Sequence, residues 1–171
     1  MDQKTKERIQ DSIRDFRMPR YNEIPDVGLF LEQTAKFISE ALKPLENIAI
    51  TGSMISNYVK RGLIAKPVKK QYDREQIAYL FFIAVAKSVL SLEEISWVIQ
   101  IQKASYPAAR AYEYFCRELE NVLFYVFGLK SQLDRVGTED TEEKTILRNT
   151  IIAVAHKTYL NKCLAAIQAH G

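Results

Sequence analysis

Apolar residues along this chain recur mostly every three or four positions, which is the spacing of amphipathic helices. This spacing predicts seven helices, which begin near residues 4, 26, 52, 73, 91, 107 and 142. Between residues 63 and 72, an apolar pair, a proline and two lysines indicate a small β-hairpin instead. The predicted fold class is therefore all-α with one small hairpin.

Residues with capping preferences mark the helix ends in the N-terminal half. Asp26 is the expected N-cap of the second helix, and Pro44 ends that helix because the residue before a proline avoids the helical region. Thr51 or Ser53 is expected to cap the third helix, and Gly62 stands where a helix stops. These signals delimit a short third helix.

Two later helices start with reciprocal capping signals. Asp73 is followed three residues later by Gln76, and Ser91 is followed in the same way by Glu94. In this spacing the first side chain caps the helix, while the second hydrogen-bonds back to the backbone N–H of the first residue. Both helices are therefore expected to begin at defined positions, one of them directly after the hairpin.

Positive charge is concentrated beside the third helix. The chain has a formal net charge of +3, but residues 60–74 contain six basic residues and one acidic residue. From residue 104 to the end, basic and acidic residues are equal in number, at eight each. A basic patch in a nearly neutral chain is typical of a nucleic-acid-binding protein, although a run of charges is also typical of a solvated loop.

The third helix has one apolar face and one polar face. Its predicted inward face is apolar and consists of Met54, Ile55, Tyr58 and Val59. Its predicted outer stripe is polar and consists of Ser53, Ser56, Asn57 and Lys60. Such a stripe fits the major groove of DNA, where Asn can pair with adenine and Ser with either base of a pair. A plain solvated helix face would show the same pattern.

We therefore predict that helix 52–61 and the basic segment 63–72 form a surface for duplex DNA. The polar stripe of the helix is expected to face bases, and the other cations are expected to contact phosphates, which set the register of a protein on the duplex. Tyr58 is expected to add a phosphate contact, and Tyr72 to pack at the base of the hairpin. The residues predicted to bind DNA are Ser53, Ser56, Asn57, Tyr58, Lys60, Arg61, Lys66, Lys69, Lys70 and Arg74.

The order of these elements resembles the DNA-binding domain of the MerR family. In that family a recognition helix ends in Gly-Leu, a wing closes on a Tyr, and the second helix after the wing often opens with Ser-Leu-Glu-Glu-Ile. The matching residues in this chain are Tyr58, Gly62, Leu63, Tyr72 and Ser91 through Ile95. The resemblance implies a winged helix-turn-helix, with the basic hairpin as its wing, in a transcriptional regulator.

The chain also resembles, over about residues 20–130, a bacterial family known only as a domain of unknown function. The resemblance lies in "PDVGLFLEQTAKFI", "ITGSMISNYVKRGLI" and "KKQYDREQIAYLFFI". It implies a MerR-like helix-turn-helix and brings no assigned activity.

The chain after residue 103 is predicted to be a separate helical region. We assign residues 1–103 to the DNA-binding domain with its N-terminal helices, and residues 104–171 to dimerisation or effector binding. A heptad-like seam suits helix pairing and consists of Phe115, Leu119, Val122 and Val126. We expect a homodimer through the C-terminal helices. A dense aromatic group indicates either packed core or the wall of a small-molecule pocket: Tyr112, Tyr114, Phe115, Phe124, Tyr125 and Phe127.

Three function classes follow from these patterns: a DNA-binding regulator, an adaptor that binds an acidic protein partner, and a helical bundle that senses a small-molecule effector. Catalysis is not expected, because the chain has neither a Gly-rich phosphate loop nor a nucleophile elbow. No cofactor is expected. His156, Cys163 and His170 are seven residues apart, about 10 Å along a helix, which is too far for one metal ion.

The N-terminal sequence has no apolar signal core, and the longest apolar run, residues 77–86, is too short to span a bilayer. We therefore expect a cytoplasmic protein without membrane contact.

Overall fold

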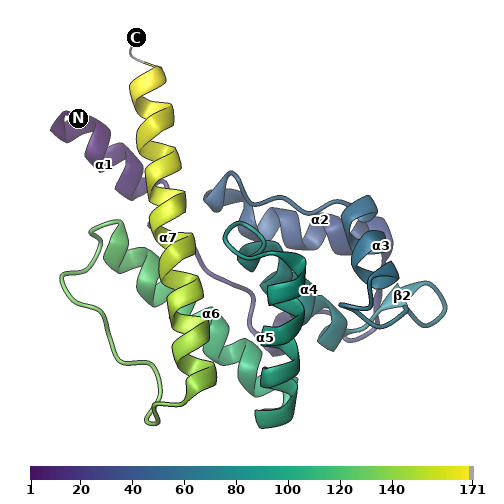
Figure 1. Cartoon of the computed structure of the whole chain (residues 1–171). Helices are drawn as coiled ribbons and strands as arrows, with labels where there is room; N and C mark the ends of the chain where they lie inside the picture. Colours follow the sequence, from purple (N-terminus) through teal and green to yellow (C-terminus); the bar gives the residue numbers. More distant parts are fainter. Residues whose placement is uncertain (170–171) are drawn as a thin grey trace.

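The computed structural model describes residues 1–169, and the chain is mainly helical (Figure 1). Its helices are α1 (Gln3–Asp11), α2 (Leu31–Leu42), α3 (Gly52–Lys60), α4 (Arg74–Ala86), α5 (Leu92–Ser105), α6 (Ala108–Val126) and α7 (Glu142–Gln168). Two short 3-10 turns, η1 (Tyr21–Glu23) and η2 (Lys43–Leu45), flank the α2 region. The predicted mainly helical class is confirmed. No helix within the described range has the length and apolar character needed to cross a membrane.

The strand pairing differs from the predicted hairpin. Strand β2 (Gln71–Tyr72) pairs antiparallel with β1 (Leu29–Phe30), which precedes α2, while the predicted hairpin is reduced to one isolated antiparallel bridge between Val68 and Gln71. Gly28 has a φ of +81°, and a Cβ at this position would lie only 3.1 Å from Gln71 Cβ. Glycine therefore lets the chain turn into β1 and approach β2 closely.

Helix α2 begins later than predicted. Its N-cap is Phe30 and not Asp26, because the residues in between turn into β1. The side chain of Gln33 accepts a hydrogen bond from the Phe30 backbone N–H at 3.0 Å. The carboxylate of Asp26 instead lies 3.8 Å from the guanidinium of Arg74.

The predicted caps of α4 and α5 are confirmed. In α4, Asp73 Oδ1 accepts from the Gln76 backbone N–H, and Gln76 Oε1 accepts from the Asp73 backbone N–H, both at 2.8 Å. Ser91 and Glu94 form the same reciprocal pair at the start of α5. These caps satisfy backbone donors that a helix leaves unpaired in its first turn.

Buried side chains from all seven helices form one apolar cluster. Helix α4 is buried on most of its circumference and lies against α2, α6 and α7, while α6 packs along α7. The predicted dimer seam of α6 is part of this cluster: Phe115, Leu119 and Val122 are buried and Val126 packs against the cluster. The seam therefore packs against α4 and α7 of the same chain and is not open to a second copy.

The segment between α1 and β1 is strapped across α6. The backbone N–H of Tyr21 donates to Glu113 Oε1 at 2.7 Å, and the guanidinium of Arg20 pairs with Glu120 at 2.8 Å. Both carboxylates belong to α6. This strap, residues 18–21, ties the chain ahead of α2 to a helix that follows α5.

Candidate nucleic-acid interface

Helix α3 is anchored by its apolar face. Ile55 and Tyr58 are buried, and the side chain of Thr51 caps the helix by accepting from the Met54 backbone N–H at 3.2 Å. Ser39 of α2 donates its hydroxyl to the carbonyl of Ile50 at 3.0 Å, which fixes the connector that leads into the cap. The burial and the two bonds hold α3 against α2 in one orientation.

The opposite face of α3 is open to solvent. It consists of the four residues that the sequence pattern assigned to an outer stripe, all of them exposed: Ser53, Ser56, Asn57 and Lys60. Three of these side chains are short, so the backbone of α3 can approach a partner closely along this face.

Helix α3 ends at Gly62 as predicted. Gly62 has a φ of +76°, and its N–H donates to the Val59 carbonyl at 3.0 Å, while the Leu63 N–H donates to the Tyr58 carbonyl at 3.0 Å. This pair of bonds is the Schellman motif, in which a glycine takes the left-handed conformation after the helix. Leu63 and Ile64 then turn into the core. The next residues consequently leave the core beside the end of α3.

A tight turn follows, with two lysines at its centre. Lys69 has a φ of +50° and Lys70 a φ of +64°, and the Gln71 N–H donates to the Val68 carbonyl at 2.9 Å. Two consecutive positive φ values are the mark of a type I′ turn, for which Asn-Gly is the favoured pair. Lysine in this conformation is strained by about 1 kcal/mol or more per residue. The turn thus carries two cations at positions where Asn-Gly would be less strained.

Helix α3 and the two-lysine turn next to β2 lie at the same end of the molecule (Figure 1). Gln76 of α4 helps to hold the segment between them, because its Nε2 donates to the Ala65 carbonyl at 3.0 Å. The sequence showed Gln76 only as a capping residue. Its second role depends on a loop 11 residues away and has no local signal.

Five cations of this region are exposed: Lys60, Arg61, Lys66, Lys69 and Lys70. Within residues 1–169, no carboxylate forms an ion pair with any of them. Their charges are therefore not neutralised by the protein and are free to attract an anionic partner. We call these five cations, together with Ser53, Ser56 and Asn57, the basic surface.

Two predicted contact residues do not belong to the basic surface. Tyr58 is only 1% exposed, and its hydroxyl is buried. It packs inside the fold as part of the apolar face of α3, so the predicted phosphate contact from its phenol is wrong. Arg74 is turned inward: its Nε donates to the Ile24 carbonyl at 2.8 Å, and its guanidinium lies over the ring of Tyr21. These bonds remove Arg74 from the predicted set of free cations.

Tyr72 packs in the core as predicted, and this burial raises the pKa of its phenol. His156 and Cys163 lie on α7, and His170 lies outside the described residues. In the part of the chain that the structure describes, no group of three or more His, Cys, Asp or Glu side chains could hold a metal ion.

Comparison with protein families matches residues 19–115 to the family described as "Domain of unknown function (DUF1836)". The matched segment contains the whole basic surface and ends within α6. Comparisons with curated proteins and with solved structures found no match. Because the matched segment makes up more than half of the chain, the protein belongs to the DUF1836 family.

Proposed function

We propose that this protein binds duplex DNA through the basic surface, as a MerR-like winged helix-turn-helix regulator of transcription in the cytoplasm. Helix α3 is the recognition helix in this proposal, α2 is the helix that precedes it, and the two-lysine turn is the wing. The observation that carries the proposal is a set of five exposed, unpaired cations around one helix face of short polar side chains.

The shape of α3 supports groove binding. Ser56 and Asn57 are exposed at the middle of the helix, where only side chains of modest length separate the backbone from a partner. The major groove of B-DNA admits a helix, and an Asn side chain can bond in a bidentate way to adenine. Lys60 would face bases at the end of the polar stripe, and Arg61 would reach a phosphate at the groove edge.

The strain at the two-lysine turn supports a functional role for its charges. A turn kept only for folding would gain stability from Asn-Gly at positions 69 and 70. Backbone strain of this kind concentrates at sites where it serves binding or catalysis. The turn would place Lys69 and Lys70 on the phosphate backbone beside the groove that α3 occupies.

Dimerisation is part of the proposal and is assigned to α7. The C-terminal half of α7 extends past the other helices except α1 (Figure 1). It exposes Leu160 at 55%, Leu164 at 49% and Ile167 at 61%. Their spacing of four and three residues is that of a heptad seam, which suits pairing with the same helix of a second copy.

Leu160→Glu with Leu164→Glu should convert a dimer to a monomer in sedimentation equilibrium, without a change in helical content by circular dichroism. A wild-type protein that sediments as a monomer at 100 μM would contradict this assignment.

The DNA proposal is tested by selecting bound sequences from a random duplex pool and then measuring affinity for the enriched duplex between about 50 and 200 mM salt. Each neutralised phosphate contributes about −0.9 to the slope of log K against log salt. Lys69→Ala with Lys70→Ala should flatten this slope by about two units. The matched control is Lys4→Ala with Lys6→Ala, which removes the same charge from exposed positions of α1, at the other end of the molecule (Figure 1).

Two outcomes would contradict the proposal. An equal loss of slope in the turn variant and the α1 control would show that only net charge matters. Failure to enrich any duplex, together with capture of an acidic protein partner that depends on Lys69 and Lys70, would favour the adaptor function.

A further inference from the structure

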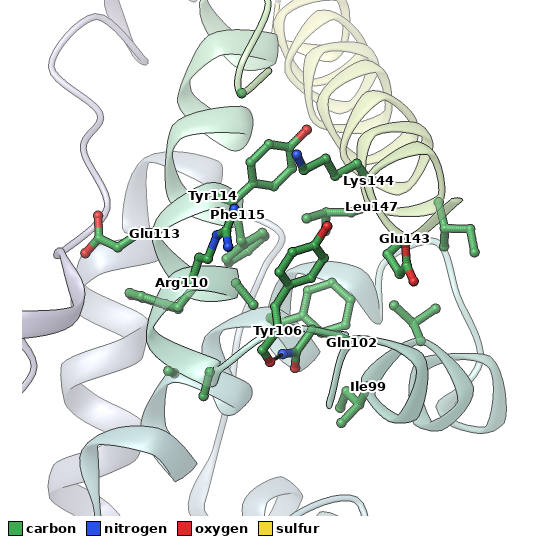
Figure 2. Close-up of a pocket in the computed structure, with 18 of the residues that line it drawn as sticks. Ile99, Gln102, Tyr106, Arg110, Glu113, Tyr114, Phe115, Glu143, Lys144 and Leu147 are labelled. Atoms are coloured by element: carbon green, nitrogen blue, oxygen red, sulfur yellow. Dashed lines mark hydrogen bonds between the residues drawn. The ribbon is translucent and has the colours of Figure 1, made fainter. Parts of the chain in front are cut away.

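A hollow of about 480 Å³ lies between α4, α5, α6 and the first turns of α7 (Figure 2). This volume is in the range of small-molecule sites, which is about 300–1,000 Å³. Much of its wall is apolar and includes Ala78, Phe82, Ile99, Ala111, Phe115 and Leu147. None of its lining residues belongs to the basic surface, and part of the wall comes from α7, outside the segment that matches the family.

The aromatic group predicted as core or pocket wall divides between the two. Tyr112, Tyr114 and Phe115 line the hollow. Phe127 is buried against the ring of Tyr159, at 5.1 Å between centroids, and so belongs to the core. The N-terminal half of α6 therefore lines the hollow, while its C-terminal end packs into the core.

The hollow has cations in its wall that are not neutralised. Arg110, Arg117 and Lys144 line it, and among residues 1–169 none of the three forms an ion pair. The guanidinium carbon of Arg110 lies 5.1 Å from the ring centroid of Tyr106, and Lys144 Nζ lies 5.5 Å from that of Tyr114. Stacking on a ring holds a cation in place while leaving it able to bond to an anion.

The two carboxylates of the wall are engaged elsewhere. Glu113 accepts from the backbone of the strap at Tyr21, and Figure 2 shows it directed away from the ring of Tyr106. Glu143 accepts from the Ser105 hydroxyl at 2.7 Å, and this bond lowers the pKa of Glu143. The ionised Glu143 at one side of the hollow disfavours a ligand with several negative charges.

Two neutral polar side chains of the hollow, those of Tyr79 and Gln102, already bond to each other. Tyr79 Oη donates to Gln102 Oε1 at 2.8 Å, and Gln102 Nε2 donates to the Tyr106 carbonyl at 2.6 Å. Burial raises the pKa of Tyr79 to about 12, so its phenol stays protonated at neutral pH. With these donors satisfied, the interior favours an apolar ligand body over one that needs hydrogen bonds.

We propose that the hollow binds a small carboxylic acid with an apolar body. The body would lie among the rings of Tyr106, Tyr114 and Phe115, and its single carboxylate would bond to Arg110 and Lys144. The proposed site shares no residue and no helix face with the basic surface, so this proposal does not rest on DNA binding.

The test is isothermal titration calorimetry of the full chain with 2-naphthoate and octanoate, and with 2-naphthamide as the uncharged match to the first. Both acids should bind with one site per chain, and the amide about tenfold more weakly than naphthoate, because it lacks the charge-assisted bonds. Arg110→Gln should weaken naphthoate about tenfold and leave the amide unchanged. Arg110 is exposed, so this variant should fold normally.

Two further variants locate the site. Ala111→Phe fills the hollow and should abolish binding of both naphthalene probes, whereas Lys36→Gln, which removes a cation 76% exposed on α2, should change nothing. Absence of binding by both acids at millimolar concentration would overturn the proposal. Equal affinity for acid and amide would overturn the assignment of the carboxylate, and binding that survives Ala111→Phe would overturn the assignment of the hollow.

Discussion

The basic surface and the hollow both present cations without carboxylate partners, but in different surroundings. On the basic surface five cations lie at a helix end and a tight turn, next to short polar side chains. In the hollow, Arg110 and Lys144 stand over tyrosine rings beside an apolar wall. The first arrangement suits a long partner with many regularly spaced charges, and the second suits one charge on a small apolar molecule.

The comparison shows that the surroundings of a cation indicate the type of partner better than the number of cations does. A count of basic residues pointed to residues 60–74 and gave no sign of the hollow, because residues 104–171 contain as many acidic as basic residues. In the folded chain the hollow brings together three basic side chains, Arg110, Arg117 and Lys144, with two acidic ones, Glu113 and Glu143, which leaves a small local excess of positive charge. Neutral composition therefore conceals a charged site.

The prediction with the largest expected effect tests whether the basic surface and the hollow belong to one folding unit. Leu119 is fully buried in the cluster that both regions share, so Leu119→Ala should lower the free energy of unfolding by about 2–5 kcal/mol. Urea unfolding followed by circular dichroism and by Trp97 fluorescence should shift to lower urea as a single transition with both probes. The control Val27→Ala, at a side chain 78% exposed and outside the proposed dimer seam, should change the unfolding free energy by less than about 0.5 kcal/mol. Two separate transitions would instead support independent domains at residues 1–103 and 104–171.

A smaller effect separates base reading from charge attraction. Asn57→Ala should weaken binding to the selected duplex by about 1–3 kcal/mol and leave binding to an unselected duplex unchanged, because only a base contact is lost. Fluorescence anisotropy with the two duplexes measures both affinities. The titration of 2-naphthoate into the same variant should match wild type. An equal loss on both duplexes would mean that Asn57 does not read sequence.

The smallest effect concerns the two-lysine turn. Lys69→Asn with Lys70→Gly should raise the free energy of unfolding by about 1 kcal/mol, since this pair adopts positive φ without the strain of lysine. For a chain of this size the melting temperature should rise by about 2–4 °C. The same variant should lose as much DNA-binding salt dependence as Lys69→Ala with Lys70→Ala. A variant that gains stability and keeps its DNA affinity would show that the lysines do not contact phosphate.

Local features of the fold were predictable from sequence. Thr51, Gly62, Asp73 and Ser91 delimit helices as expected, because caps act within one turn of the backbone. Features that depend on distant segments could not be predicted from sequence. The partner of β2 lies about 40 residues earlier in the chain, and its pairing moves the start of α2 from Asp26 to Phe30.

The candidate site followed the same division. The polar stripe of α3 could be read from helical spacing, and its exposure agrees with that reading. Helical spacing also placed Tyr58 on the inward face, and its burial agrees with that reading and not with the phosphate contact. Arg74 could not be placed, because an arginine near a basic segment serves equally well on the surface or inside. The seam of α6 was identified correctly as apolar, but spacing does not reveal whether the covering helix belongs to the same chain or to another.

The strap at residues 18–21 has a practical consequence for isolating the predicted DNA-binding domain, residues 1–103. Its bonds to Glu113 and Glu120 mean that a fragment ending at residue 103 would lose the anchor of its own N-terminal part and would uncover the face of α4 that α6 protects. Such a fragment is expected to aggregate on expression, while one that retains all of α6 keeps the anchor. The C-terminal limit of a stable fragment is therefore set by the strap near its N-terminus, because the strap needs α6 to bind to.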